Sequence, residues 1–296
     1  MTNETTKQFD YQVKEDELPL SLGAYLRRKG YSQGLLATLR IQDGVRVNNC
    51  FRRMIDPLAP GDRVQVTLRD QPSQLAANPG LDLAVLYEDD YLLALDKPPD
   101  MLVHPASPGF DDAVGNFFTA YCPGLRFRPI GRLDRHTSGL CLVAKDQLTA
   151  CCLTGSTDKD YYAVAEGLIQ QDQGLIDAPL QRVAGDIIRR QVAEGGQPSR
   201  TEFQVLHRSK GLTFLRLRLL TGRTHQIRAH LAYLGHPLAG DSLYGGSTEL
   251  IRRQALHCGG LRFIHPITGL PVQVLSPLPP DMAALLPAGE RQLPSF

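Results

Sequence analysis

The sequence predicts an α+β protein in which a large domain, built on a mixed, largely antiparallel β-sheet, follows a small basic domain. Between residues 83 and 220, strand-like segments with alternating apolar and polar residues recur, separated by short helical patterns. Nine Lys and Arg residues lie in residues 19–69 against three acidic residues, a formal charge of +6, whereas the whole chain carries +1. We therefore divide the 296 residues into a small domain (11–70), a linker (71–80), a large domain (81–280) and a C-terminal tail (281–296).

The composition indicates a soluble cytoplasmic protein without a metal or disulfide framework. Hydrophobic residues make up 42% and charged residues 21% of the chain, which is ordinary for a globular protein. No apolar run approaches the roughly 20 residues of a membrane span, and the N-terminus lacks a signal-peptide pattern. The six cysteines include no C-x-x-C pair, so reduced thiols are expected. With a net charge of +1, nucleic-acid binding would have to come from local clusters of charge.

The small domain is expected to contain two helices followed by short strands. Helical spacing of apolar residues runs over 20–26, and Ser32 is placed to cap a second helix. Residues 44–49 predict a strand and turn, and residues 61–66 predict another strand. The polar residues 1–10 are expected to be frayed.

The large domain is expected to begin with a β-hairpin and to alternate strands with short helices. The strands are expected at 83–87, 91–96, 141–144, 159–167, 196–206 and 212–220, with a further one beginning at 256. Helices are expected at 111–121, as a shortened segment within 148–159, and from a Thr224 cap to a Gly235 stop.

Asp134 is the first candidate catalytic residue. It lies between Arg132 and Arg135 in a turn-forming segment that leads into a buried strand, and nearby opposite charge keeps a carboxylate ionised. Taken alone, an aspartate between arginines is more often part of a salt-bridged loop. The segment Thr221–Leu231 adds further candidates, because His225 and Arg228 are three residues apart and share one helical face.

These segments, in this order, resemble the RluA-like family of RNA pseudouridine synthases over about residues 83–279. The family pattern H-R-L-D-x-x-T-S-G, K-x-Y-x-A, T-G-R-T-H-Q-I-R-x-H and P-L-x-G-D-x-x-Y-G corresponds here to residues 132–139, 159–163, 221–230 and 237–245. Each motif alone is weak, but four in the right order make coincidence improbable. Residues 11–70 similarly resemble an S4-type RNA-binding domain, with Asn48-Asn49 at its strand–turn motif.

The resemblance implies an enzyme that isomerises specific uridines in structured ribosomal or transfer RNA to pseudouridine, with no metal and no organic cofactor. By motif position, Asp134 is the catalytic carboxylate, Tyr161 lies against the uracil, and Arg228 pairs with Asp134. RNA-binding roles are expected for residues of both domains, namely Arg132, Arg223, His225, Gln226, Arg27, Arg28, Arg46 and Arg52. RNA is the expected partner, and a monomer is the expected state.

The chemistry of these residues agrees with the resemblance. Isomerisation breaks the N1–C1′ bond and joins C5 to C1′, and an ionised Asp134 could either add to the sugar or remove a proton from it. Tyr161 is a poor intrinsic base, because an unperturbed phenol has a pKa near 10, so contact with the base is the safer role. Flipping the nucleotide out of its stack costs roughly a few kcal/mol, which phosphate contacts from Arg216 and Arg218 could offset.

Three departures from the family pattern leave the substrate open. Gly131 stands where the family has His, Lys97-Pro98-Pro99-Asp100 replaces K-P-x-G, and the segment 148–159 is shorter than usual. Lys97, His104 and Asp241 are expected to be structural.

Two alternatives remain at this point. The first is a catalytically weak RNA-binding or RNA-chaperone relative. The second is a nucleosidase-type or glycosidase-type hydrolase, because a carboxylate that works at C1′ would also serve hydrolysis. Glycosidases usually need a second carboxylate about 5–10 Å away, and none of the four motifs supplies one, which counts against a hydrolase.

Overall fold

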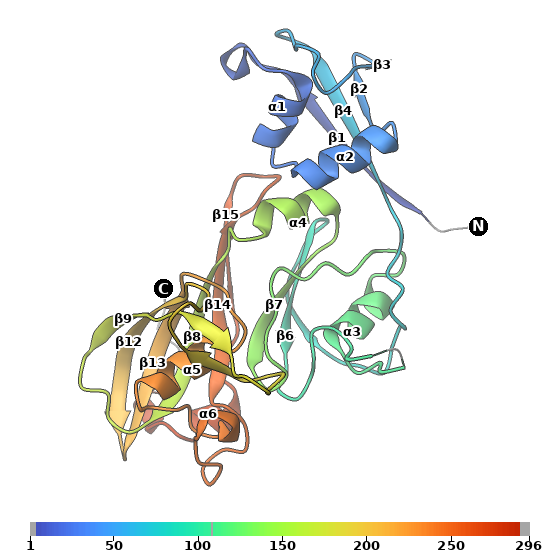
Figure 1. The fold of residues 1–296 in the computed structure, drawn as a ribbon. Coiled ribbons are helices and arrows are strands. Elements are labelled where there is room, and N and C mark those ends of the chain that lie inside the picture. Colours follow the sequence, from blue (N-terminus) through green and yellow to red (C-terminus); the bar gives the residue numbers. More distant parts are fainter. Residues whose placement is uncertain (1–3, 108, 291–296) are drawn as a thin grey trace.

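The computed structural model describes residues 4–107 and 109–290, which form two units joined by an extended segment (Figure 1). The N-terminal unit is a four-stranded antiparallel sheet in the order β1-β4-β2-β3, with its helices packed on the sheet. Its elements are β1 (Thr5–Gln12), η1 (Glu15–Glu17), α1 (Leu22–Arg28), α2 (Gln33–Ile41), β2 (Val45–Val47), β3 (Cys50–Phe51) and β4 (Arg63–Asp70).

Local sequence signals explain most of this unit. The hydroxyls of Ser21 and Ser32 accept hydrogen bonds from the amides of Ala24 and Leu35, at 3.3 and 3.2 Å, and so cap α1 and α2. The expected order of two helices and then short strands is confirmed. The expectation of frayed residues 1–10 is wrong for residues 5–10, because residues 5–12 pair along their whole length with β4, and residues 1–3 lie outside the described ranges.

The large unit is a mixed sheet of nine strands in which β7 and β14 form the parallel pair. The order is β5-β6-β7-β14-β8-β13-β12-β9, with β15 pairing to β14. The strands are β5 (Ala84–Glu88), β6 (Leu92–Lys97), β7 (Ser138–Ala144), β8 (Asp158–Glu166), β9 (Gln173–Asp177), β12 (Arg200–Ser209), β13 (Leu212–Leu219), β14 (Leu256–Ile264) and β15 (Pro271–Leu275). The predicted α+β class with a mixed, largely antiparallel sheet is confirmed.

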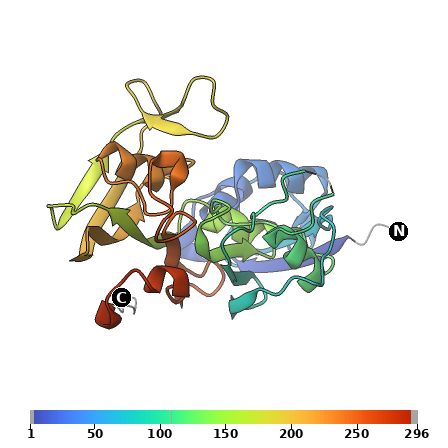
Figure 2. The same cartoon turned by 90° about the horizontal axis from the view of Figure 1, so that it is seen from below.

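Helices and one separate hairpin complete this unit. The helical elements are α3 (Val114–Tyr121), α4 (Gln147–Leu153), α5 (Gln226–Tyr233), η2 (Ser242–Tyr244), α6 (Pro280–Ala283) and η3 (Ala288–Glu290). Strands β10 (Leu180–Arg182) and β11 (Arg190–Val192) form a two-stranded sheet of their own, and their hairpin projects from the body of the molecule (yellow in Figure 2). None of the helices in the described ranges is long and apolar enough to cross a membrane.

The sheet separates two hydrophobic clusters, because alternate residues of a strand face opposite sides. Every residue of β7 is buried, and Tyr161 of β8 belongs to the larger cluster. Its neighbour Tyr162 belongs to a second cluster that includes Met282 and Leu286. These two C-terminal residues are buried, so the expected tail boundary at 281 lies too early in the chain.

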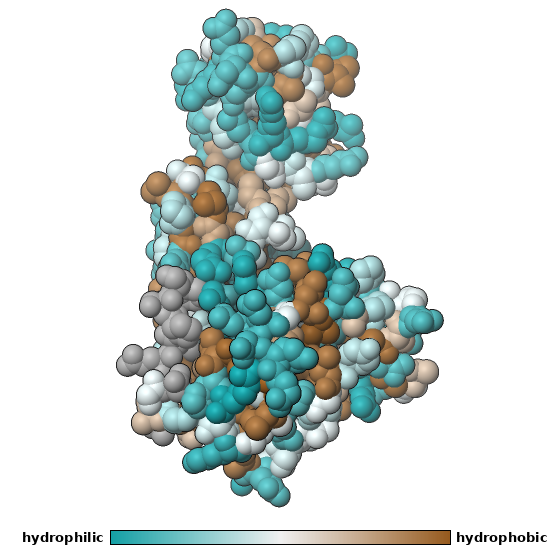
Figure 3. Space-filling model, turned by 90° about the vertical axis from the view of Figure 1, so that its left-hand side faces the viewer, coloured by the Kyte–Doolittle hydropathy of each residue, from teal (hydrophilic) through white to brown (hydrophobic). Residues whose placement is uncertain are grey.

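The N-terminal unit docks on α4 through apolar and charged contacts. Leu148 of α4 is buried in the small core, and Cys152 lies so close to Gly30 that a Cβ there would come within 2.3 Å of the sulfur. Lys7 lies 3.6 Å above the ring of Tyr91, in the large unit. The surface of the N-terminal unit is mostly hydrophilic on the face shown in Figure 3 (upper lobe). The two units therefore share a packed junction rather than a bare tether.

Candidate active site

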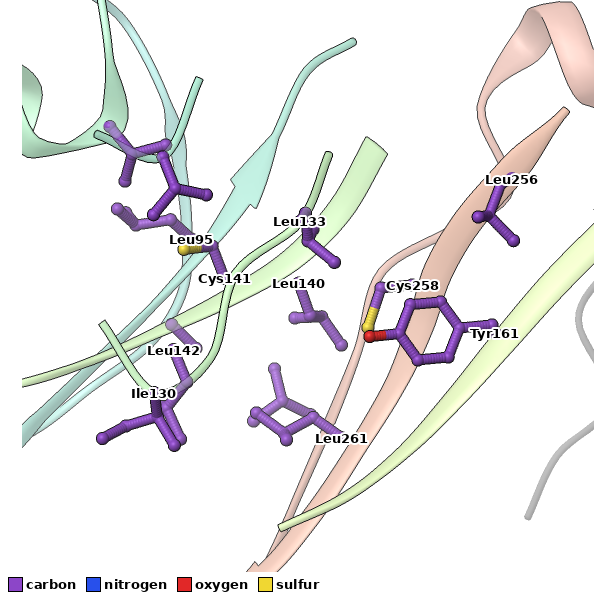
Figure 4. Packing of buried hydrophobic residues seen from close by; sticks show 14 of the residues in the cluster. Leu95, Ile130, Leu133, Leu140, Cys141, Leu142, Tyr161, Leu256, Cys258 and Leu261 are labelled. Carbon is purple, nitrogen blue, oxygen red and sulfur yellow. The ribbon is translucent and has the colours of Figure 1, made fainter. Parts of the chain in front are cut away.

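The Asp134 loop is held along β7 by its backbone and by one apolar anchor. The amide of Ile130 donates to the carbonyl of Leu142 at 2.7 Å, and Leu133 is buried in the large core, near Leu140 (Figure 4). The amide of Thr137 donates to the carbonyl of Asp134 at 3.1 Å and closes a turn. The backbone therefore fixes where the Asp134 side chain emerges, and that side chain is 26% exposed.

Lys97 joins the same loop to the segment after β6. Its ammonium is fully buried and donates to the carbonyls of Pro98, Met101 and Arg135 at 2.8, 2.9 and 3.0 Å. Burial lowers the pKa of Lys97 from its usual 10.5 to about 8. Three carbonyl acceptors match the three donors of an ammonium, so the expected structural role has a specific form: Lys97 ties two loops together.

Arg228, on the first turn of α5, connects Asp134 to a second carboxylate. Its Nη1 lies 3.0 Å from Oδ2 of Asp134, while its Nε and Nη2 lie 2.7 and 2.8 Å from the two oxygens of Asp241. Both Arg228 and Asp241 are buried. Asp241 was expected only to be structural, and its pair with Arg228 was not predicted, although the G-D-x-x-Y-G motif contains the residue.

Tyr244 is a second residue that the sequence analysis missed. Its hydroxyl accepts a hydrogen bond from the amide of Arg190, at 2.9 Å, and lies 3.1 Å from Nδ1 of His225. The guanidinium of Arg228 lies 5.0 Å from the centre of the Tyr244 ring, within cation–π range. Tyr244 is the tyrosine of the G-D-x-x-Y-G motif, and this was the signal in the sequence that could have marked it as a site residue.

His225 caps α5 in place of the expected Thr224, in a left-handed conformation with φ 57°. Its side chain makes no capping hydrogen bond, and its Nε2 lies 3.7 Å from Oδ2 of Asp134. Burial lowers the pKa of His225, with Arg228 acting in the same direction and Asp134 against it. The ring is therefore neutral near pH 7.

Tyr161 lies on β8 at the floor of the site. Its ring is buried in the large core, and its hydroxyl points to the Cys258 thiol (Figure 4). Burial raises the pKa of Tyr161 well above 10, and Cys258 and Asp134 add to the effect. The phenol is therefore protonated, which agrees with the contact role expected from the sequence.

Gln226 is a structural residue, contrary to the RNA-binding role expected for it. The side chain is buried, accepts hydrogen bonds from Thr221 and the Arg223 amide, and donates to the Arg200 carbonyl and the Thr201 hydroxyl. These four hydrogen bonds of the Gln226 side chain hold the turn before α5. Both N–H donors of the amide are used, so none is left for RNA.

Arg216 and Arg218 also lie elsewhere than expected. They pair across the sheet with Tyr162 and Asp160, so they share the face opposite Tyr161. Both guanidinium groups lie within 4 Å of the buried Asp160 carboxylate, Arg216 at 3.0 Å and Arg218 at 3.8 Å. They cannot offset base flipping at Asp134, because the sheet separates them from it.

The remaining candidates for RNA contact lie on the surface. Arg132 and Arg223 are exposed in the large unit, and the Nε of Arg223 donates to the Pro198 carbonyl at 3.3 Å. Arg27, Arg28 and Arg52 are exposed on the N-terminal unit, whereas Arg46 is half-buried and its guanidinium is held by both oxygens of Asp43.

The structure gives a reason for Gly131. Its φ is +80°, in the left-handed region, and a Cβ there would lie 3.3 Å from Nζ of Lys159. That ammonium donates to the carbonyl of Ile130 at 3.1 Å. A histidine at this position would strain the backbone and crowd Lys159. Glycine therefore allows both the left-handed backbone and the contact of Lys159 with the Ile130 carbonyl.

Two other features of the described ranges lie outside this site. A surface cavity of about 540 Å³ lies between the α4–β8 loop and the β14–β15 hairpin and contains no candidate residue. Within residues 4–107 and 109–290, the His, Cys, Asp and Glu side chains form no group of three that could hold a metal ion.

Comparison with known proteins assigns the class. The family model described as RNA pseudouridylate synthase matches residues 91–233. Together with the motif order and the fold, this makes the chain a member of the RNA pseudouridylate synthase family, an enzyme that acts on RNA and belongs to the isomerases.

Relatives and solved structures agree with that class. The chain is 38% identical to the uncharacterized RNA pseudouridine synthase YlyB of Bacillus subtilis, over 83% of this chain and 86% of that protein. It is 35% identical to ribosomal large subunit pseudouridine synthase D of Xanthomonas campestris, over 79% and 77%. The structure of human RNA Pseudouridylate Synthase Domain Containing 1 matches with a TM-score of 0.58 and 28% identity, over 70% of this chain and 89% of that one.

Proposed function

We propose that Asp134 is the catalytic carboxylate with which this pseudouridine synthase isomerises uridine. One observation carries the assignment: Arg228 bonds to Oδ2 of Asp134, and no residue in the described ranges donates to the other oxygen, Oδ1. An ion-paired carboxylate with one oxygen available suits either covalent addition to the sugar or removal of a sugar proton.

Arg228 and Tyr161 have separate roles in the isomerisation. The N1–C1′ bond breaks, the uracil turns and C5 bonds to C1′. C5 then loses its proton and N1, released from the sugar, gains one, so no atom is gained or lost overall. Arg228 pairs with Asp134 and orients its carboxylate. Tyr161 supports the uracil by contact, since a phenol buried against Cys258 strongly resists ionisation.

Tyr161→Phe tests the role of that phenol. A contact role predicts that kcat stays within about tenfold of wild type, since the ring is retained, whereas proton transfer by a positioned group typically contributes about 10²- to 10⁴-fold. Cys258→Ala is the matched variant, because it removes the thiol next to the hydroxyl and leaves the ring in place.

We further propose a ribosomal RNA target and an S4-like role for the N-terminal unit. Several relatives are named ribosomal large subunit pseudouridine synthase D, which favours ribosomal over transfer RNA. Exposed Arg27, Arg28 and Arg52 suit phosphate contacts by the N-terminal unit. We also propose that the protein is a cytoplasmic monomer. One chain supplies every residue around Asp134, so the site does not need a second subunit.

Pseudouridine mapping tests the target. RNA from cells with and without the protein, and from cells that carry only Asp134→Asn, is mapped for pseudouridine. The expected result is one or a few ribosomal sites that are lost in both deficient strains. A complete map in the strain without the protein would contradict the assignment and would favour the chaperone alternative.

The hydrolase alternative has less support. Asp241 is the nearby second carboxylate, but both of its oxygens accept hydrogen bonds from Arg228 and it is buried. A carboxylate occupied in this way is not available to activate water, as an inverting glycosidase requires.

A further inference from the structure

The contacts of His225 exceed what its place in the fold requires. An N-cap residue normally accepts a hydrogen bond from the helix backbone, and Ser, Thr, Asp or Asn does this best. His225 makes no such bond and occupies a left-handed backbone conformation, which is strained for a residue other than glycine. Strain of this kind is held by surrounding contacts, and the two ring nitrogens of His225 lie against the Tyr244 hydroxyl and the Asp134 carboxylate.

Hydrogen bonding fixes which ring nitrogen carries the proton. The Tyr244 hydroxyl already accepts a hydrogen bond from the Arg190 amide, so its own proton is available for Nδ1 of His225, 3.1 Å away. A neutral imidazole has one donor and one acceptor nitrogen. If Nδ1 accepts from Tyr244, then Nε2 carries the proton.

The other tautomer is disfavoured on both sides of the ring. It would leave the Nε2 lone pair facing Oδ2 of Asp134 at 3.7 Å, which is repulsive. It would also make Tyr244 accept from both Arg190 and His225 and leave the hydroxyl proton without its His225 acceptor. Both effects favour Nε2–H.

We propose that His225 is a positioning residue which, with its Nε2–H directed by Tyr244, holds Oδ2 of Asp134 together with Arg228 and leaves Oδ1 as the reacting oxygen. The inference rests on the assignment of Asp134 as the catalytic carboxylate. At 3.7 Å the Nε2–Oδ2 contact is longer than a hydrogen bond, and catalytic contacts of this kind often tighten only when substrate is bound.

The proposal also gives the β10–β11 hairpin a role at the reacting atoms. The Arg190 amide that bonds to Tyr244 belongs to β11, and the Arg189 guanidinium lies 5.8 Å from the centre of the same ring. A chain of contacts therefore runs from the projecting hairpin through Tyr244 and His225 to Asp134.

Nitrogen-15 NMR of the full-length protein, with histidine labelled in the ring, tests the tautomer without an activity assay. His225→Gln identifies the signal by its loss. The expected result is an unprotonated Nδ1 and a protonated Nε2 in wild type, and a mixture of tautomers in Tyr244→Phe. A protonated Nδ1 in wild type would overturn the proposal.

Kinetics on the RNA site found by mapping test the positioning role. His225→Ala is expected to lower kcat by about tenfold or more while KM for RNA changes less than twofold, because an interaction made mainly in the transition state is lost. His225→Gln, which can place an N–H near the position of Nε2, is expected to recover most of kcat. An Ala variant that changes KM alone would show an RNA-binding residue and would overturn the proposal.

Controls distinguish a loss of folding and an error in the role given to Asp134 from an error in the role given to His225. Tyr233→Phe, at an exposed tyrosine of the same helix, should behave as wild type, and thermal melting reports whether each variant folds. If Asp134→Asn retained activity, the assignment of Asp134 would fail. If Asp134→Asn is inactive and His225→Ala keeps its kcat, only the role given to His225 fails.

Discussion

Arg228 and Asp241 form a two-point ion pair, with Nε and Nη2 at 2.7 and 2.8 Å from the carboxylate oxygens, beside the Asp134 carboxylate. The planar fork of a guanidinium matches a carboxylate in this geometry and keeps a third donor for another acceptor. Arg228 is thereby oriented before RNA binds, so its contact with Asp134 does not have to be assembled during the reaction.

Asp241→Asn should destabilise the protein and reduce activity together. The variant leaves a buried guanidinium short of one negative partner, and breaking a buried pair of this kind costs about 3 kcal/mol or more. Denaturant unfolding measures the change. Asp43→Asn, which breaks an exposed pair with Arg46, is the matched control and should leave the unfolding midpoint unchanged.

Asp134→Asn should abolish pseudouridine formation, by more than about 10³-fold, and leave RNA affinity within about twofold of wild type. The amide keeps the size of the side chain but cannot act as an anion. Product formation and filter binding on the same RNA measure the two quantities. Asp112→Asn, at an exposed acid before α3, controls for the loss of one negative charge.

Lys97→Met should remove a pH dependence of stability that the wild type shows above pH 8. The pKa of Lys97 is about 8 in the folded protein and near 10.5 when unfolded, so the unfolded chain binds the proton more tightly in that window. The free energy of unfolding of wild type should therefore rise, relative to the variant, by up to about 3 kcal/mol between pH 8 and 10.5.

Urea unfolding across that pH range measures the effect. Below pH 8, where the lysine is charged in both states, the difference between wild type and Lys97→Met should be constant. Lys210→Met, at an exposed loop lysine, should track wild type throughout. Parallel curves for wild type and Lys97→Met above pH 8 would contradict the lowered pKa.

Substitution of Arg27 and Arg28 by Gln should weaken RNA binding and flatten its dependence on salt. Each lost phosphate contact reduces the slope of log affinity against log salt by about one. Arg46→Gln should have a smaller effect, since Asp43 already holds that guanidinium. Binding titrations at several salt concentrations measure the slopes, and an unchanged slope in the double variant would remove these residues from the RNA contact.

Substitution is a better test of the N-terminal unit than its deletion. Removal of residues 1–75 would expose Leu148 and Cys152 of α4, which pack against the small core. The truncated chain could lose activity through unfolding alone, and such a loss would say nothing about RNA.

The sequence predicted the elements whose signals are local. Ser32 caps α2 as expected, and the alternating segments gave the positions of β5, β6, β8, β12 and β13 but not those of β9, β10, β11 and β15. β1 was missed because its polar residues become a strand only through pairing with β4, about 50 residues or more away in the chain. Strand alternation likewise shows that Arg216 and Arg218 share a face, but only the sheet order shows which face adjoins Asp134.

At the site, motif order predicted the contact of Arg228 with Asp134 across 94 positions of sequence. The same motifs could not separate residues that face substrate from residues that hold the loops. Gln226 was expected at the RNA and is buried, while Asp241 and Tyr244 were passed over and lie against Arg228. The distinction depends on which way each side chain turns after the chain folds, and that is set by distant partners.

The packed junction at α4 has a consequence for substrate choice. Because Leu148 and Cys152 are embedded against the N-terminal unit, the distance from its arginines to Asp134 is set by the protein and not by the RNA. An RNA that contacts both the arginines and Asp134 must therefore have its target uridine at the same distance from the phosphates that the arginines bind. The enzyme would then select its site by the spacing between two RNA features as well as by local sequence. The length of α4 would be one determinant of that spacing.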